Sequence, residues 1–328
     1  MLEMARQRIC VTGGSGFLGR FVCAALRRRG VDEGHLFVPR RRDFDLTRHD
    51  HVQRLYEVAR PNLVIHLAAE VGGIGANSEH PGRFFFANMA MGMHLIEQAR
   101  ICSIRKFVHT GTVCAYPKLS PVPFKESDLW NGYPEETNAP YGVAKKALFV
   151  MLDAYQREYG LPSAVVVPVN LYGPFDNFDL ESSHVIPALI RKCQDAAHRR
   201  QAGDDGSLVC WGTGSASREF LYVEDAAEAI VRAAERIETP DPINLGTGRE
   251  ITIRDLVQKI ADLIDFTGPI EWDATRPDGQ PRRCLDTARA RKLLDWSADT
   301  ELVEGLRRTI EWWSSQGPPP QRLSGNIH

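Results

Sequence analysis

A glycine-rich stretch, Gly13-Gly14-Ser15-Gly16-Phe17-Leu18-Gly19, joins an apolar segment at residues 7–12 to an amphipathic segment at residues 17–28. The first segment is typical of a buried strand, and the second is typical of a helix that ends at Gly30. Glycine allows a tight turn and a close approach of the backbone to a pyrophosphate, whose charge the helix N-terminus attracts. The stretch therefore predicts a dinucleotide site, with an ordinary glycine-rich turn as the alternative.

Apolar runs alternate with helical patterns over the first half of the chain. The runs lie at 35–38, 63–67, 106–109 and 164–169, and the helical patterns between them lie at 51–59, 85–101 and 141–159. Apolar runs without strict alternation of apolar and polar residues are typical of strands buried on both faces. We therefore predict an α/β fold, a Rossmann doubly wound parallel sheet with helices on both faces.

The second half of the chain has a different texture. After residue 170 the loops are rich in Gly, Pro and Asn, and a further helical pattern lies at 184–198. These features predict a smaller α/β C-terminal substrate domain, although a strand-helix-strand pattern at 219–246 is expected to return to the first sheet. The expected division is an NAD(P)-binding Rossmann domain at 1–169 with 219–246, a substrate-binding domain at 170–218 and 247–313, and a disordered tail at 314–328.

The composition argues against several classes of protein. Lys plus Arg (40) nearly balances Asp plus Glu (42), so no overall field recruits nucleic acid or an anionic membrane. No stretch approaches the roughly 18 apolar residues of a membrane span, and the first apolar run is too short for a signal peptide, so we expect a cytoplasmic protein. The seven cysteines lack C-x-x-C spacing, which predicts reduced thiols and no metal site.

Three arginines indicate which dinucleotide is bound. An NAD site usually places an acidic residue about 20 residues beyond the glycines, where it holds the ribose 2′-hydroxyl. Arg40, Arg41 and Arg42 stand at that point of this sequence. A guanidinium can bind a 2′-phosphate through two hydrogen bonds, so the sequence favours NADP, with NAD possible. The alternative is a solvated loop whose arginines contact no ligand.

A tyrosine and a lysine four residues apart form the candidate catalytic pair. Tyr141 and Lys145 lie on one face of a predicted helix, where a positive charge favours the phenolate and lets the tyrosine exchange protons. Alone, this spacing is also typical of an ordinary amphipathic helix. The pair gains significance because Thr112 follows a predicted strand of the same sheet and offers a hydroxyl at its carboxyl end.

Together these residues resemble the extended short-chain dehydrogenase/reductase family of nucleotide-sugar enzymes. Further motifs, long and in the same order, resemble its GDP-L-fucose synthase branch to about residue 225 and more loosely to about 314. These motifs are His66-Leu67-Ala68-Ala69, Val71-Gly72-Gly73-Ile74 with Asn77, Cys114-Ala115-Tyr116-Pro117-Lys118, Glu136-Thr137-Asn138, Asn170-Leu171-Tyr172-Gly173-Pro174, Asp176-Asn177-Phe178, Ser183-His184-Val185-Ile186-Pro187, Trp211-Gly212-Thr213-Gly214 and Arg218-Glu219-Phe220.

The resemblance implies C3 and C5 epimerisation of a GDP-4-keto-6-deoxy-hexose, followed by reduction at C4 with NADPH. The implied catalytic residues are Thr112, Cys114, Tyr141, Lys145 and His184, with Cys114 and His184 as base and acid of the epimerisation. Expected cofactor contacts are Gly13, Ser15, Gly16, Phe17, Leu18, Gly19, Arg40, Asp45, Leu46, Leu67, Ala68, Ala69, Tyr141, Lys145, Pro168 and Asn170. Expected substrate contacts are Val71, Asn170, His184, Lys192, Trp211 and Arg218.

Three positions depart from the family pattern. Thr112 replaces a serine but keeps the hydroxyl, Ser15 stands where an arginine often contacts the cofactor phosphate, and Lys192 replaces an arginine expected to contact substrate. Two other functions stay open: a redox-neutral NAD-dependent nucleotide-sugar epimerase or dehydratase, and a non-catalytic NAD(P) sensor. The intact Thr112, Tyr141 and Lys145 set argues against the sensor, which needs no proton donor.

The resemblance also implies a homodimer, because many nucleotide-sugar relatives pair through a four-helix bundle. The predicted helices at 85–101 and 141–155 could supply the interface. Their apolar faces carry Phe85, Met89, Met93, Leu148, Leu152 and Tyr155. Such stripes are also typical of a simple core.

Overall fold

A six-stranded parallel sheet forms the centre of the computed structural model, which describes residues 1–276 and 279–316. Its order is β2 (Leu36–Phe37), β1 (Ile9–Thr12), β3 (Leu63–His66), β4 (Lys106–Thr110), β5 (Ser163–Pro168) and β9 (Ile243–Leu245). The chain passes from β1 to β2 on one side and then to β3 on the other. This reversal between β1 and β3 is where a doubly wound sheet binds its ligand, and the predicted fold class is confirmed.

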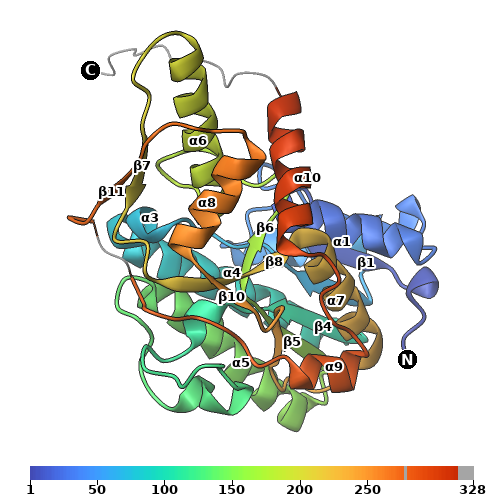
Figure 1. Ribbon diagram of the computed structural model, residues 1–328. Helices are drawn as coiled ribbons and strands as arrows, with labels where there is room; N and C mark the ends of the chain where they lie inside the picture. Colours follow the sequence, from blue (N-terminus) through green and yellow to red (C-terminus); the bar gives the residue numbers. More distant parts are fainter. Residues whose placement is uncertain (277–278, 317–328) are drawn as a thin grey trace, which may run out of the picture.

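Helices cover both faces of this sheet. On one side α1 (Phe17–Arg28) packs against α7 (Val223–Arg236), as Figure 1 shows, and α7 packs against α9 (Ala288–Leu294). On the other, α4 (Pro81–Ile101) packs against α2 (His49–Ala59) and α5 (Ala139–Tyr159), and α3 (Ile74–Glu79) precedes α4. In the described part of the chain, no helix combines the length and apolarity that crossing a bilayer requires.

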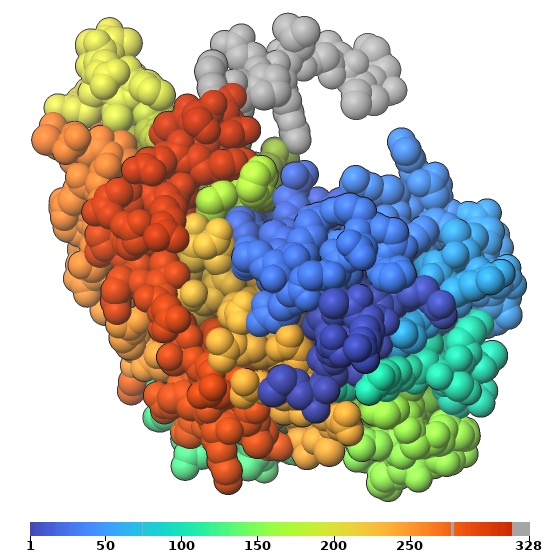
Figure 2. Space-filling model, turned by 90° about the vertical axis from the view of Figure 1, so that its right-hand side faces the viewer, coloured from blue at the N-terminus to red at the C-terminus, as the bar shows by residue number. Residues whose placement is uncertain are grey.

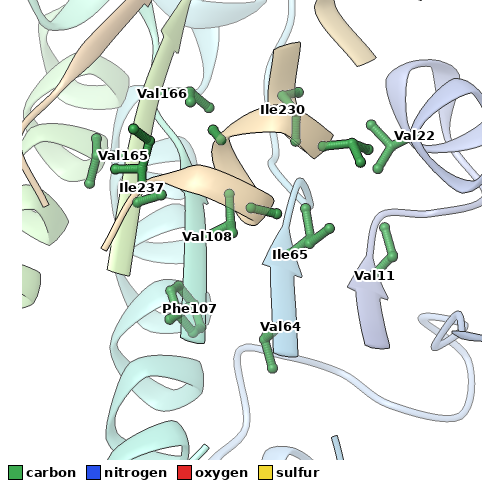
Figure 3. Close-up of a cluster of buried hydrophobic side chains, with 14 of the residues drawn as sticks. Val11, Val22, Val64, Ile65, Phe107, Val108, Val165, Val166, Ile230 and Ile237 are labelled. Atoms are coloured by element: carbon green, nitrogen blue, oxygen red, sulfur yellow. The ribbon is translucent and has the colours of Figure 1, made fainter. Parts of the chain in front are cut away.

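The main core lies between the strands and these helices. Every residue of β1, β3, β4 and β5 is buried, as expected for strands covered on both faces. Figure 3 shows Val11, Ile65 and Val108 on neighbouring strands facing Val22 of α1 and Ile230 of α7. Burying each such side chain contributes about 1.5–3 kcal/mol, so this core fixes the strand ends that carry the glycine-rich loop.

A smaller unit with its own core covers the carboxyl edge of the sheet. It contains the sheet β10-β8-β6, formed by β6 (Asn170–Tyr172), β8 (Ser217–Tyr222) and β10 (Glu250–Thr252), and the parallel pair β7 (Leu208–Trp211) and β11 (Ile270–Asp273). Helices α6 (Val185–Gln201), α8 (Ile253–Leu263) and α10 (Leu302–Ser315) pack around these strands (Figure 1). Short 3-10 turns lie at Met4–Arg6, Glu33–His35, Val113–Ala115 and Glu126–Trp130.

The segment 219–246 is divided between the two units. Its second strand, β9, pairs with β5 in the six-stranded sheet, as the sequence suggested. Its first strand, β8, instead pairs with β6 and β10 in the small sheet. Local patterning indicates that a segment is a strand, but the tertiary structure decides which sheet that strand joins.

The C-terminal boundary also differs from the expectation. The tail was expected to begin at Ser314, but α10 continues through Ser315 because Trp312 and Trp313 anchor its last turn against Phe178. Residues 317–328 of the expected tail lie outside the described part of the chain. The C-terminal segments, drawn in red in Figure 2, lie beside the N-terminal segments in blue. Phe175 joins them, with its ring 4.9 Å from that of Trp312 and 6.1 Å from that of Phe21.

Candidate active site

A cavity of about 770 Å³ runs along the carboxyl ends of the central strands and continues under the smaller unit. Its position at the β1/β3 reversal is the one expected for a nucleotide in a doubly wound fold. The sequence-predicted site residues line this cavity, with one exception, Arg40. Local patterns from both halves of the chain therefore converge on one space.

The glycine-rich loop is shaped by close backbone contacts. A Cβ atom at Gly19 would lie 2.1 Å from the carbonyl oxygen of Gly13, and one at Gly13 would lie 2.8 Å from the amide nitrogen of Ala68. Gly13 also has a φ of +73°, which favours glycine. Helix α1 begins after Gly16 with no side-chain cap, so its first N–H groups point at the cavity with the positive end of the helix dipole.

The exception among the predicted site residues is Arg40, in the turn after β2. Arg40 is exposed and lies outside the cavity wall, where its carbonyl accepts hydrogen bonds from the amides of Asp43 and Phe44. Arg41 lines the cavity instead, and its guanidinium lies 2.9 Å from the carboxylate of Glu70. The sequence shows three consecutive arginines and does not distinguish them, because the turn after β2 decides which one faces inward.

The catalytic pair is held deep in the cavity by a close helix contact. A Cβ at Gly142 would lie 2.2 Å from the carbonyl oxygen of Cys114, so glycine lets α5 approach the turn at Val113–Ala115. Burial raises the pKa of Tyr141, the nearby Cys114 adds to this rise, and a hydrogen bond with Thr112 opposes it. Burial also lowers the pKa of Lys145 to about 7.

Cys114 and His184 approach the cavity from the two units. The hydroxyl of Thr112 accepts a hydrogen bond from the amide of Cys114 at 3.2 Å, which fixes the turn that presents the sulfur. His184 occupies the N-cap position of α6 without a side-chain cap and lines the cavity, where desolvation by surrounding atoms lowers its pKa. A thiol and an imidazole on opposite units can exchange protons with a molecule held between them.

The far end of the cavity is an aromatic platform with two cations. Lys192 Nζ and Arg276 Cζ each lie 5.0 Å from the ring centroid of Trp211, whose side chain is 54% exposed. Arg218, Asn170 and Val71 also line the cavity. An exposed indole flanked by cations suits a planar base with attached phosphates.

Sequence reasoning missed several residues of the cavity wall. The loops that supply Glu70, Glu135, Gln280 and Arg283 have no recognisable local pattern. Asn138 had a signal, because it ends the motif Glu136-Thr137-Asn138, but the motif gave it no role. Its side chain donates a 2.7 Å hydrogen bond to Glu135 just before α5. In the described residues, no group of three or more His, Cys, Asp or Glu side chains is arranged to hold a metal ion.

Fold and site together define a Rossmann-type oxidoreductase that uses a dinucleotide. A glycine-rich loop lies at the sheet reversal, and a Tyr-Lys pair faces the same cavity. The chain belongs to the NAD dependent epimerase/dehydratase family, whose model matches residues 9–246. This membership confirms the resemblance seen in the motifs.

Individual relatives resemble the chain over nearly its whole length. It is 37% identical to GDP-L-fucose synthase of Escherichia coli (strain K12), covering 94% of this chain and 97% of the relative. It is 36% identical to probable GDP-L-fucose synthase 1 of Oryza sativa subsp. japonica, covering 93% and 92%. A GDP-L-fucose synthetase from Naegleria fowleri, solved bound to NADP, superposes with a TM-score of 0.84 at 27% identity, covering 94% of each chain.

Proposed function

We propose that the chain is a GDP-sugar epimerase-reductase that epimerises C3 and C5 of a GDP-4-keto-6-deoxy-hexose and then reduces C4 with NADPH. The observation that carries the proposal is the convergence of Thr112, Cys114, Tyr141, Lys145 and His184 on one cavity. Two proton-transfer sites of different chemistry, a thiol with an imidazole and a phenol, are needed for two successive reactions on one sugar. The relatives named as GDP-L-fucose synthases support the same substrate class.

The cofactor proposal fits the residues present. Helix α1 offers an uncapped N-terminus to a pyrophosphate, and Gly13 and Gly19 keep the loop free of side chains that would fill the approach. Arg41 lines the cavity and can bind a 2′-phosphate, which favours NADP. The related Naegleria fowleri protein was solved with NADP bound. When bound, NADPH supplies the hydride for the reduction at C4.

In the reductive step, Tyr141 acts as the acid. Burial raises its pKa, so the phenol carries a proton at neutral pH and donates it to the C4 oxygen. Thr112 hydrogen-bonds the phenol and orients it. Lys145 lies one helical turn away on the same face and lines the same cavity, where it would help to hold the cofactor.

In the epimerisation, Cys114 and His184 exchange protons with the carbons next to the ketone. The C4 carbonyl acidifies these protons, so a thiolate can remove one while the pair of electrons moves into an enolate. The imidazole returns a proton from the other unit of the protein, which inverts the carbon. Trp211, Lys192 and Arg218 bind the nucleotide and its phosphates at the far end of the cavity.

The deciding experiment follows absorbance at the nicotinamide band with GDP-4-keto-6-deoxymannose and either NADPH or NADH. We expect one cofactor oxidised per product formed, faster with NADPH. Tyr141→Phe is expected to lower this rate by about 10²–10⁴-fold while cofactor binding persists. Turnover of a nucleotide sugar without net oxidation would instead identify the redox-neutral epimerase, and NADPH binding without any turnover would identify a sensor.

A separate assay isolates the epimerisation. Cys114→Ser is expected to block incorporation of deuterium from heavy water at C3 and C5, because serine is a much weaker base than a thiolate. The same variant should still reduce a ketone that has already been epimerised. Exchange at the wild-type rate would remove Cys114 from this role.

We further propose that the protein is a cytoplasmic homodimer paired through α4 and α5. These adjacent helices expose apolar side chains, among them Phe86 at 64% and Val150 at 51%. Leu148 and Leu152, expected on this face, are instead buried in the core, where Leu148 packs against Gly92. Sedimentation velocity should show a dimer that Phe86→Glu weakens, and a wild-type monomer would contradict the proposal.

A further inference from the structure

An extended segment of the C-terminal unit, residues 279–286, runs through the active site between two parts of the protein. On one side its carbonyls at Pro281 and Arg283 accept hydrogen bonds from the amides of Ser217 and Glu219 in β8. On the other, Cys284 and Asp286 exchange backbone hydrogen bonds with Phe124. Backbone bonds on both sides hold the segment rigidly, so its inward side chains have fixed positions.

The guanidinium of Arg283 is clamped by this arrangement. Its Nε and Nη2 donate to Gln280 Oε1 at 3.3 and 3.1 Å, and Gln280 Nε2 donates to the carbonyl of Lys118 at 2.8 Å. The remaining nitrogen, Nη1, donates to Cys114 Sγ at 3.8 Å. Gln280 therefore holds two of the three guanidinium nitrogens, and Cys114 Sγ accepts the hydrogen bond from the third.

Arg283 is a buried cation that lacks an acidic partner. Its residue is 9% exposed, and in residues 1–276 and 279–316 no carboxylate forms an ion pair with it. Its neighbour Arg282, by contrast, is exposed and paired with Glu250. A buried charge is costly unless an anion compensates it, so the environment favours negative charge at the atom that Nη1 faces.

The other groups described around Cys114 do not place a full positive charge beside its sulfur. Tyr141, from α5, is a phenol whose pKa is raised, and Thr112 contributes a neutral hydroxyl at the end of β4. Burial lowers the pKa of His184, at the start of α6, which disfavours its charged form. Lys145 lies a turn beyond Tyr141, and its pKa of about 7 leaves it only partly charged.

We propose that Arg283 is a positioning residue that stabilises negative charge on the sulfur of Cys114 and so makes this thiol the base of the epimerisation. The inference rests on the proposed function for its role in turnover. In the step it serves, a C–H bond next to the ketone breaks, the S–H bond forms, and the electron pair enters the enolate. The guanidinium donates throughout and transfers no proton, since arginine stays protonated.

The test measures the reactivity of the thiol without any substrate. Wild type, Arg283→Gln and the matched control Arg282→Gln are alkylated with iodoacetamide over a range of pH, and each cysteine is followed by peptide mass spectrometry. We expect Cys114 to react at least about tenfold more slowly at neutral pH in Arg283→Gln, because the thiolate is the reactive form. Arg282→Gln should react as wild type does, and exposed Cys102 serves as the internal reference.

Equal Cys114 rates in Arg283→Gln and wild type would overturn the proposal. If Arg283→Gln loses its fold by circular dichroism, Arg283→Lys takes its place: it keeps the charge but not the fork held by Gln280, and we expect an intermediate Cys114 rate. A wild-type rate in the lysine variant combined with a wild-type rate in Gln280→Ala would also overturn the positioning role.

A second measurement distinguishes a role of Arg283 in activating Cys114 from a role in binding the phosphates of the substrate. Arg283→Gln should slow deuterium exchange at C3 and C5 about tenfold with little change in KM. A raised KM with unchanged exchange at saturation would assign Arg283 to substrate binding and contradict the proposal. Failure of the proposed function would appear as absent GDP-sugar turnover in wild type, and the alkylation result does not depend on it.

Discussion

The cofactor half and the substrate half of the cavity are built on different principles. The cofactor half consists of the glycine-rich loop, the ends of β1, β3 and β4, and α5, all of which rest on strands buried along their whole length. The substrate half consists of α6, β7, β8 and residues 279–283, which rest on small sheets and long-range hydrogen bonds. The first joins elements from across the first 160 residues through one buried parallel sheet. The second joins the consecutive elements α6, β7 and β8 to the distant segment 279–283.

These two kinds of support allow one fold to keep its chemistry while its substrates change. The buried parallel sheet fixes the hydride-transfer end, because shifting a strand would expose many apolar side chains. The substrate end depends on a few polar contacts, above all Glu219, whose carboxylate accepts hydrogen bonds from the amides of Thr247, Gly248 and Leu285. Changes there can alter recognition without moving the catalytic pair.

The largest expected effect comes from breaking the substrate half at Glu219. Glu219→Ala removes the acceptor of three amides, those of buried Leu285, half-buried Thr247 and exposed Gly248, and we expect the free energy of unfolding to fall by about 3–5 kcal/mol. Urea denaturation measures this loss, with Glu250→Ala on the neighbouring strand β10 as the milder control. GDP affinity should fall more than NADPH affinity, and equal losses would show that the two halves behave as one unit.

A single methyl group at Gly19 should disrupt the glycine-rich loop of the cofactor half. Gly19→Ala would place a Cβ 2.1 Å from the Gly13 carbonyl oxygen, and relieving this overlap costs about 1–3 kcal/mol. We expect weaker NADPH binding in fluorescence titrations with GDP binding retained. Gly34→Ala, where the new atom meets nothing within 4 Å, is the control. Unchanged NADPH affinity in Gly19→Ala would mean that the loop does not hold the pyrophosphate.

The aromatic platform around Trp211 allows the substrate half to be weakened without touching the cofactor half. Trp211→Ala removes the surface on which a base can stack, which is worth about 1–3 kcal/mol. We expect calorimetry to show GDP affinity reduced about tenfold or more while NADPH affinity and the midpoint of thermal unfolding stay the same. Leu119→Ala, at a more exposed apolar side chain outside the cavity, should change neither affinity. A fall in NADPH affinity in Trp211→Ala would show that Trp211 contributes to the cofactor half and would contradict its assignment to the substrate half.

The most gradual expected effect, spread over several pH units, concerns the buried charge of the cofactor half. Lys145 has a pKa of about 7, whereas an unfolded lysine titrates near 10.4, so between these values the unfolded chain binds the extra proton. Stability of the cofactor-free protein should therefore rise with pH from about 7, by at most about 1.4 kcal/mol per pH unit from this group. Lys145→Met should remove that part of the slope in urea titrations, and exposed Lys259→Met should retain it. Identical slopes in wild type and Lys145→Met would contradict the assigned burial.

Sequence patterns predicted the elements of the first half closely. The predicted helix at 17–28 coincides with α1, and the helix at 141–159 differs from α5 only at its start, since Ala139 and Pro140 open the first turn. The patterns did not indicate α3, which has six residues and too few positions to show a period. The predicted start of the tail at Ser314 was wrong because contacts with Phe178, which is distant in sequence, hold the last turn of α10.

Sequence patterns were sufficient to predict the strands and helices, the glycine-rich loop and the spacing of Tyr141 and Lys145. Each of these is a local feature that glycine, apolar runs or helical periodicity reports directly, and buried apolar strands alternating with helices favour a parallel sheet. The folded structure was needed to show that Arg41 rather than Arg40 faces the cavity, that β8 joins the small sheet, and that Arg283 reaches Cys114. The turn after β2 sets the direction of Arg41, and the other two outcomes join segments far apart in sequence, so packing and hydrogen bonds rather than residue type fix these positions.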